Sequence, residues 1–266
     1  MKRREFIQRG TLGAAGLALL PPPRLHAGSM QDADERELTA RALDAARSAG
    51  ASYADVRIQR NRTQSLGTRE RQITSFDDAE TYGFGVRVLA EGAWGFAASR
   101  DVNAEEVVRV ARQAVAQARA NSRALSRPVE LAPVEAFPDV RWESPLRIDP
   151  FDVPVEEKVA LLIQANEAAM RVPRARFVTT SVFFVREEKV FASTVGSYIT
   201  QTLTRTYPVT TVTAVAEDGS DFQTRQSTDV PPRGLGYEYV VDSDLPARAV
   251  VWAEEAAAKL TAKPVE

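Results

Sequence analysis

The stretch that fixes the architecture of this chain is residues 81–99, Thr-Tyr-Gly-Phe-Gly-Val-Arg-Val-Leu-Ala-Glu-Gly-Ala-Trp-Gly-Phe-Ala-Ala-Ser. Apolar side chains recur at every second position over residues 84–88 and again over residues 94–98. This period predicts two strands, each with one buried face. Between them, Glu91 and Gly92 form a turn pair, because glycine accepts positive φ. The stretch therefore predicts a core hairpin.

Glycine is unusual inside strands, and this hairpin holds three of them at Gly83, Gly85 and Gly95. Such glycines indicate a bulge or a place where another backbone comes close. No side chain in the hairpin can activate a nucleophile or bind a metal. We therefore expect the hairpin to be a structural element.

The composition is that of an ordinary globular protein. The chain has 266 residues, of which 44% are hydrophobic and 26% are charged. Its net charge of −2 argues against nucleic-acid binding. It has no cysteine, so no disulfide supports the fold.

Residues 1–27 resemble a twin-arginine export signal. Arg3 and Arg4 are followed by a short apolar run over residues 10–20 and then by prolines. The run is too short to span a membrane and suits a signal peptide, so no stable membrane span is expected. We expect export to the periplasm, with an uncleaved anchor or a cytoplasmic protein as alternatives. Cleavage after Ala27 would remove His26, the only histidine.

The hairpin belongs to a first predicted unit, residues 35–122. Helical periodicity predicts a helix over residues 35–49, and a strand over 53–66 follows, with 69–76 pairing back on it. After the hairpin, Asn103 is a predicted N-cap for a helix over 104–121.

A proline-rich linker, residues 123–154, leads to a second predicted unit, residues 155–266. A helix is predicted over residues 155–171, capped near Asp152 with Pro154 in its first turn. The remaining predicted elements are strands over 177–186, 190–194, 198–216 and 222–228, with turns at Glu187-Glu188 and Asp218-Gly219, an interruption at Gly196, a bulge or edge at Pro208, a loop over 230–239 and a helix over 245–260. The predicted class is α+β, with two helix–antiparallel-sheet–helix units.

The residue inventory excludes several chemistries. Without His26 the chain has no histidine and no cysteine, so a typical catalytic zinc site and a Ser-His or Cys-His pair are both excluded. The remaining acid/base or hard-metal candidates are carboxylates, which can equally be surface charge: Asp77, Asp78, Glu80, Glu217, Asp218, Asp221, Glu254 and Glu255.

Two further patterns have a structural and a functional reading. A cluster of arginines is either an anionic contact surface or a solvated sheet face: Arg57, Arg60, Arg62, Arg69 and Arg71. A ladder of threonines is either a half-exposed sheet face or an edge that accepts an extended peptide: Thr200, Thr202, Thr204, Thr206, Thr210, Thr211 and Thr213.

The motifs together resemble the TldD/PmbA (TldE) family. The first-domain motifs are Tyr-Ala-Asp-Val-Arg at 53–57, Gly-Phe-Gly-Val-Arg-Val at 83–88 and Trp-Gly-Phe-Ala at 94–97. Residues 192–201, with Arg205 downstream, resemble the second-domain signature, and residues 234–238 and 263–266 also match. The structural motif residues are Gly83, Gly85, Arg87, Gly95, Phe96 and Gly196.

The resemblance implies a zinc metallopeptidase that acts on unfolded or small peptides as a dimer. The family's metal motif, His-Glu-x-x-x-His, follows its Pro-Val-Glu position, which here is residues 264–266. We therefore expect no catalytic residue and no metal ligand in this chain, and zinc in a missing catalytic half. The residues expected to contact a peptide are Thr200, Thr202, Arg205 and Tyr237.

Two functions follow from this resemblance. The chain is the non-catalytic N-terminal region of such a peptidase, which forms dimer interface and peptide-cavity wall. Alternatively, it is a metal-free binding or scaffold subunit that pairs with a full-length family member. A remnant without activity is a third reading. The partners expected are a family subunit, as homo- or heterodimer, and a peptide.

Overall fold

A computed structural model describes residues 28–262, and the packing below lies within residues 35–262. The predicted export signal, residues 1–27, lies outside the described part. The helices are α1 (Gly28–Ser48), α2 (Ala104–Ser122), α3 (Val155–Ala169), α4 (Glu238–Asp242) and α5 (Leu245–Lys259). The strands are β1 (Tyr53–Arg69), β2 (Gln72–Ala90), β3 (Ala93–Ser99), β4 (Val140–Glu143), β5 (Ala175–Ser193), β6 (Tyr198–Val215) and β7 (Phe222–Gln226).

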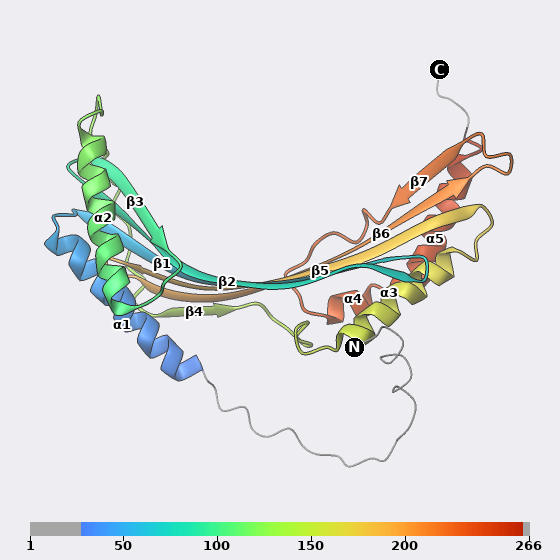
Figure 1. Ribbon diagram of the computed structural model, residues 1–266, viewed down its shortest axis with the longest axis horizontal. Coiled ribbons are helices and arrows are strands. Elements are labelled where there is room, and N and C mark those ends of the chain that lie inside the picture. The colour runs from blue at the N-terminus through green and yellow to red at the C-terminus, as the bar shows by residue number, and fades with distance from the viewer. Residues whose placement is uncertain (1–27, 263–266) are drawn as a thin grey trace, which may run out of the picture. The chain divides into compact units, whose positions relative to one another are not determined.

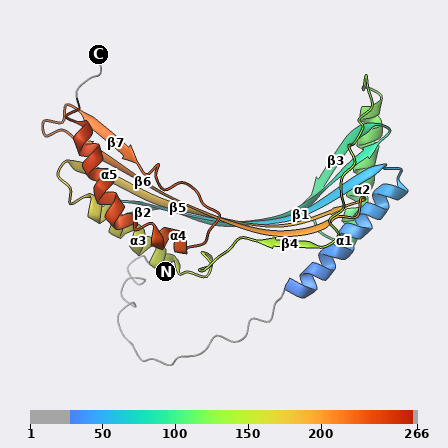
Figure 2. The same cartoon turned by 180° about the vertical axis from the view of Figure 1, so that it is seen from behind.

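All seven strands belong to one sheet (Figure 1). Its order is β3-β2-β1-β5-β6-β4, with β7 also paired to β6. Every pairing is antiparallel except that of β4 with β6. The α+β class is therefore confirmed, and helices cover this antiparallel sheet at both ends of its long strands (Figures 1 and 2).

Strands from both predicted units share this sheet, because β1 pairs with β5 along its length from Asp55↔Ser193 to Arg69↔Thr179. The segment that links them is also tied down. Its β4 pairs with β6, and the Phe137 amide donates to Ser197 Oγ at 3.1 Å. The boundaries at residues 122 and 155 stay predictions.

The predicted turn at Glu187-Glu188 is wrong, since β5 continues through it without a break. Both acidic residues have partners on neighbouring strands: Glu187 pairs with Arg205 on β6, and Glu188 lies 3.7 Å from Arg60 on β1. Cross-strand ion pairs support charged residues in the middle of a strand. A turn signal read from one strand cannot include such partners.

Of the two predicted helix N-caps, one is confirmed and the other is wrong. Asn103 is the N-cap of α2, and its side chain accepts from the amides of Glu105 and Glu106. The predicted cap near Asp152 is wrong, because Pro154 itself occupies the N-cap of α3 and offers no side-chain acceptor. Asp152 instead closes a turn, its amide donating to Asp149 O.

Side chains alternate between the two sides of each strand. In β1, even-numbered residues such as Val56 and Leu66 lie on the side that the helices cover, and odd-numbered ones point to the opposite face. We call the first side the helix face and the second the open face. The same strand therefore contributes to two separate cores on its helix face.

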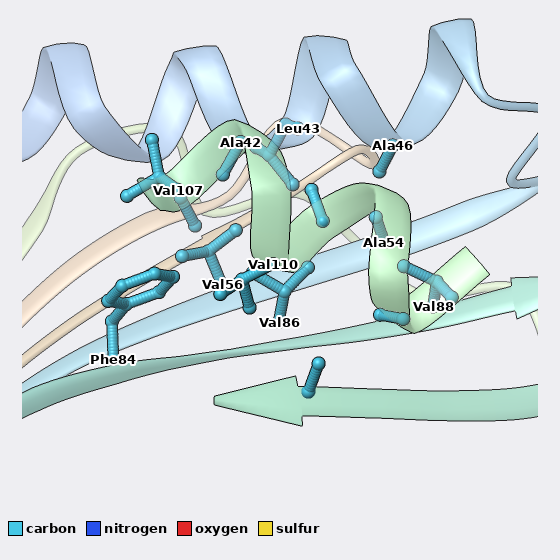
Figure 3. Packing of buried hydrophobic residues seen from close by; sticks show 14 of the residues in the cluster. Ala42, Leu43, Ala46, Ala54, Val56, Phe84, Val86, Val88, Val107 and Val110 are labelled. Carbon is cyan, nitrogen blue, oxygen red and sulfur yellow. The ribbon is translucent and has the colours of Figure 1, made fainter. Parts of the chain in front are cut away.

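The first core packs α1 and α2 against β1, β2 and β3. It is built almost entirely of alanine and valine, and Figure 3 shows Ala42 and Ala46 of α1 meeting the strands beside Val107 and Val110 of α2. Gly95 on β3 lies directly under α2, because a Cβ there would come 2.0 Å from Ala114 O. The close backbone approach expected at this glycine is confirmed.

The second core packs α3, α4 and α5 against the other ends of β1, β5 and β6. Its largest buried side chain is Trp252, whose Nε1 donates to Asp229 at 3.0 Å. Phe184 packs beside Tyr237 with their ring centroids 6.2 Å apart.

Candidate functional site

The open face is the candidate functional surface. Most of its side chains are exposed or half-buried, unlike those of the helix face. Its exposed large apolar side chains include Phe96 of β3, Phe177 and Phe183 of β5, and Tyr207 of β6. Phe183 and Tyr207 are direct cross-strand partners, and an exposed apolar cluster of this kind indicates an interaction surface.

A hollow of about 500 Å³ lies on this face, over β1, β2 and β3. Glycine forms part of its floor, since Gly83 and Gly85 are successive open-face positions of β2. The ring of Phe96 leans over Gly85, because a Cβ added there would lie 2.8 Å from the ring. On the β1 side the hollow is lined by Arg57, Gln59 and Asn61. It combines hydrogen-bonding side chains with an apolar wall.

A buried carboxylate stands at one end of the hollow. Asp55 is 2% exposed and accepts from Arg87 Nε at 2.8 Å, with Nη2 at 2.7 Å. Burial raises the pKa of Tyr53, and the nearby Asp55 carboxylate raises it further. Asp55 and Arg87 form a neutral pair that fixes the wall of the hollow.

The predicted peptide-contact residues do not come together. Thr200 and Thr202 lie on the helix face, beside β4, whereas Arg205 is exposed on the open face and pairs with Glu187. Tyr237 is 2% exposed inside the second core, where burial raises its pKa to about 12. One peptide on one face would not reach all four.

The remaining motif residues have structural positions. Gly83 lies against the β3 backbone, since a Cβ added there would come 2.9 Å from Ser99 O, and the β2–β3 register stays unshifted. The bulge considered for this hairpin is therefore wrong. Gly196 has φ of 104° in the turn between β5 and β6, where its amide donates to Ser193 O.

The arginine cluster is divided between the two faces, so it is not one anionic contact surface. Arg57 and Arg69 are on the open face, and Arg60 and Arg62 are on the helix face. Each has an acidic neighbour, and Arg71 pairs with Glu167 at 2.6 Å. These positions favour the reading as a solvated sheet face, on which the arginines have acidic neighbours.

Several of these pairs form a charged trough on the helix face between the two cores. Arg60, Arg62 and Arg186 line it from β1 and β5, together with Glu80 and Glu188. Arg62 and Arg186 both lie over the ring of Phe151. The Arg62 hydrogen bond holds the pKa of Asp78 below its usual range. Each arginine of the trough has a carboxylate partner, which for Arg186 is Asp149.

The carboxylate candidates are dispersed over the surface. Asp218 accepts from Ser220, and Glu255 pairs with Arg225. Within residues 28–262, no group of three or more His, Cys, Asp or Glu side chains lies close enough to hold a metal ion. Of the helices in the same range, none is both long and apolar enough to cross a bilayer.

We did not predict the hollow from the sequence. Its signal was present as Gly83 and Gly85 in a strand, but their neighbours on β1 become known only once the register pairs Gly85 with Arg57 and Gly83 with Gln59.

Two parts of this chain match domains of one protein family. Residues 54–118 match PmbA/TldA metallopeptidase domain 1, and residues 148–263 match the PmbA/TldA metallopeptidase central domain. A metalloprotease of Methanocaldococcus jannaschii is 26% identical over 193 residues, which are 73% of this chain and 41% of the relative. A metalloprotease of Methanothermobacter thermautotrophicus is 31% identical over 174 residues, 64% of this chain and 36% of the relative. The chain thus spans less than half the length of these relatives.

Solved structures share the fold. A protein from Thermotoga maritima described as a modulator of a DNA gyrase superposes with a TM-score of 0.63 at 16% identity, over 87% of this chain and 50% of that one. TldE from Thermococcus kodakarensis superposes with a TM-score of 0.56 at 14% identity, over 84% of this chain and 47% of that one. With both family domains matched in order along one continuous sheet, this chain belongs to the PmbA/TldD family.

Proposed function

We propose that this chain is a non-catalytic, peptide-binding part of a PmbA/TldD-type metallopeptidase. The observation that carries the proposal is the open face, which presents apolar side chains and a polar hollow on one sheet. Extended peptides suit such a surface, since a sheet offers rows of side chains at strand spacing. The family match supports proteolysis as the process that this binding serves.

The donor set of this chain does not fit a typical catalytic zinc. Residues 27–266 contain no histidine or cysteine, which are the usual ligands together with carboxylates. We therefore derive no hydrolytic step from its residues. In our proposal the zinc and its His-Glu-x-x-x-His motif are supplied by a catalytic half outside these 266 residues, and this chain contributes dimer interface and cavity wall.

The alternative is a metal-free binding or scaffold subunit that pairs with a full-length family member. The structural likeness to TldE supports the fold required for such pairing. The two functions differ in what restores hydrolysis. A fragment carrying only a catalytic half would complement this chain in the first case, whereas only a full-length relative would hydrolyse peptide in the second.

The decisive experiment measures binding and cleavage of one labelled, unstructured peptide by the purified chain. We expect the chain alone to bind the peptide, seen as a rise in fluorescence anisotropy, and to leave it intact by mass spectrometry. Adding a catalytic-half fragment should produce cleavage that a zinc chelator abolishes. Chelator-sensitive cleavage by the chain alone would overturn the non-catalytic role, and an unchanged anisotropy would overturn peptide binding.

We also propose that the protein is exported through its twin-arginine segment. The support is the sequence Arg3-Arg4 ahead of an apolar run. Replacing both arginines by lysine should retain the protein in the cytoplasm, as measured by fractionation. Equal export of the lysine variant would contradict the proposal.

A further inference from the structure

One arginine beside the hollow retains its hydrogen-bonding capacity. The Asp55 carboxylate is already taken by Arg87, at 2.7 and 2.8 Å. Arg57 lies 3.9 Å from Asp55, beyond hydrogen-bond distance, and its side chain is 59% exposed. Together these three groups leave one net positive charge at the mouth of the hollow.

The floor next to Arg57 is open because β2 carries glycine there. In the register of the sheet, Gly85 is the direct neighbour of Arg57, and Gly83 is the neighbour of Gln59. Neither glycine raises a side chain between β1 and β3. Phe96, which is 57% exposed, forms an apolar wall above Gly85.

These features together suit the binding of a carboxylate group. A guanidinium binds a carboxylate through parallel hydrogen bonds. The guanidinium of Arg57 lies 5.6 Å from the centre of the Phe191 ring on β5 and makes no hydrogen bond to any residue that the structure describes. A side-chain amide next to it, here Gln59, can hydrogen-bond a peptide group. An apolar side chain beside the carboxylate would cover Phe96.

We propose that the hollow binds a carboxylate of an extended peptide, with Arg57 as its pairing cation and Phe96 as the wall for the adjoining apolar side chain. The inference rests on the proposed peptide-binding function and adds the substrate class. The carboxylate is supplied either by the C-terminus of the peptide or by an acidic side chain.

The charged trough on the helix face does not compete for this role. Its arginines already have carboxylate partners, such as Arg62 with Asp78 at 3.2 Å and Arg60 with Glu80. A carboxylate ligand would have to displace one of them. Arg57 has no such competitor within hydrogen-bond distance among the residues that the structure describes.

The test compares short labelled peptides that end in phenylalanine and differ only in charge. It is done at physiological salt, which screens interactions between distant exposed charges and leaves the close pairing with Arg57. One has a free C-terminal carboxylate, one a C-terminal amide, and two amidated versions carry an internal glutamate or glutamine. We expect wild-type protein to bind either carboxylate peptide about tenfold more tightly than its neutral counterpart. Preference for the free C-terminus or for the glutamate identifies the source of the carboxylate.

Variants then assign the effect to this hollow. Arg57→Gln should remove the tenfold preference, because the carboxylate and the neutral peptides then meet the same uncharged side chain. The matched control is Arg69→Gln, which removes another exposed open-face arginine of the same strand, and it should retain the preference. Gly85→Ala should weaken the binding of all four peptides several-fold, since its Cβ occupies the floor and displaces the Phe96 ring.

The outcomes separate this inference from the function on which it rests. If no peptide binds, the proposed function fails. If peptides bind but neutral and carboxylate versions bind equally, or if Arg57→Gln and Arg69→Gln have equal effects, the carboxylate site is overturned while peptide binding stands. The comparison of peptides on wild-type protein needs no variant, so a misfolded variant does not prevent the test.

Discussion

The two cores lie under the same strands and are packed in different ways. In the first, α2 lies so close to β3 that its backbone touches Gly95, and the surrounding positions are alanine and valine. In the second, Trp252 and Phe184 fill the space, and polar side chains are buried among them.

The difference shows that the distance between a helix and the sheet determines which side chains the core between them can hold. Where the helix and strand backbones touch, no long side chain fits, and the fold depends on small residues. The second core has space for the polar side chain of Asn166, which hydrogen-bonds to three partners. It donates to Thr68 Oγ1 and Glu70 O at 3.0 Å and accepts from Thr180 at 2.7 Å. Lys158 is also buried there and donates to Gln64.

The greatest loss of stability should come from emptying the second core. Trp252→Ala should lower the free energy of unfolding by roughly 4 kcal/mol, because it removes a fully buried indole and leaves a cavity. Urea denaturation measures it. Trp142→Ala on β4 removes an indole that is 45% exposed and should cost far less. Equal losses in the two variants would contradict this description of the core.

Disrupting the first core requires adding atoms. In Gly95→Ala the new Cβ would meet Ala114 O at 2.0 Å, so α2 has to move, at a cost of about 3 kcal/mol. The matched control is Gly234→Ala, where a Cβ finds its neighbour at 3.9 Å. Thermal unfolding compares them, and an unchanged Tm for Gly95→Ala would show that the helix does not pack this tightly.

A smaller loss tests the polar character of the second core. Asn166→Ala leaves Thr68 and Thr180 without their amide partner and should cost about 2 kcal/mol. On the open face, Asn61→Ala removes a half-exposed amide and should stay close to wild type. If Asn166→Ala is as stable as Asn61→Ala, the buried network does not stabilise the second core.

The smallest change in stability at neutral pH is expected for replacing Lys158. Burial lowers its pKa from the ordinary 10.5, so between the lowered value and 10.5 the unfolded chain binds more protons than the folded one. Wild-type stability should therefore rise with pH in that window, and the gain is lost as pH falls. Lys158→Met should lack this rise and lie within about 1 kcal/mol of wild type at pH 7.

The measurement is urea denaturation of both proteins at a series of alkaline pH values below the ordinary lysine pKa of 10.5. Asp78, Asp149 and Glu157 face Lys158 and favour its charged form, whereas Arg62 opposes it. Parallel pH curves for wild type and Lys158→Met would contradict a buried lysine with a lowered pKa.

Local elements could be predicted because their signals are local. The hairpin of residues 81–99 forms with its turn at Glu91 and Gly92, and Asn103 caps the next helix. Errors arose where long-range partners decide the outcome. Glu187 and Glu188 predict a turn locally, but they lie in a continuous strand because arginines on β6 and β1 pair with them.

The site was less predictable than the fold. Thr200, Thr202 and Arg205 are near neighbours in sequence, yet one-residue alternation places them on opposite faces. Tyr237 is in a loop-like sequence and ends in a core, because Gly236 and Tyr237 pack under Ile148, whose carbonyl accepts from the Tyr237 amide.

The α+β class, the family motifs and the residue inventory that excludes a typical zinc site can all be read from the amino-acid sequence, since composition and short-range periodicity express them directly. Three features required the folded chain: both groups of strands form one sheet, Gly95 accommodates a helix, and Gly83 and Gly85 open a hollow beside Arg57. Register explains this division, because a glycine in a strand creates space, whereas strand pairing decides which side chain borders it.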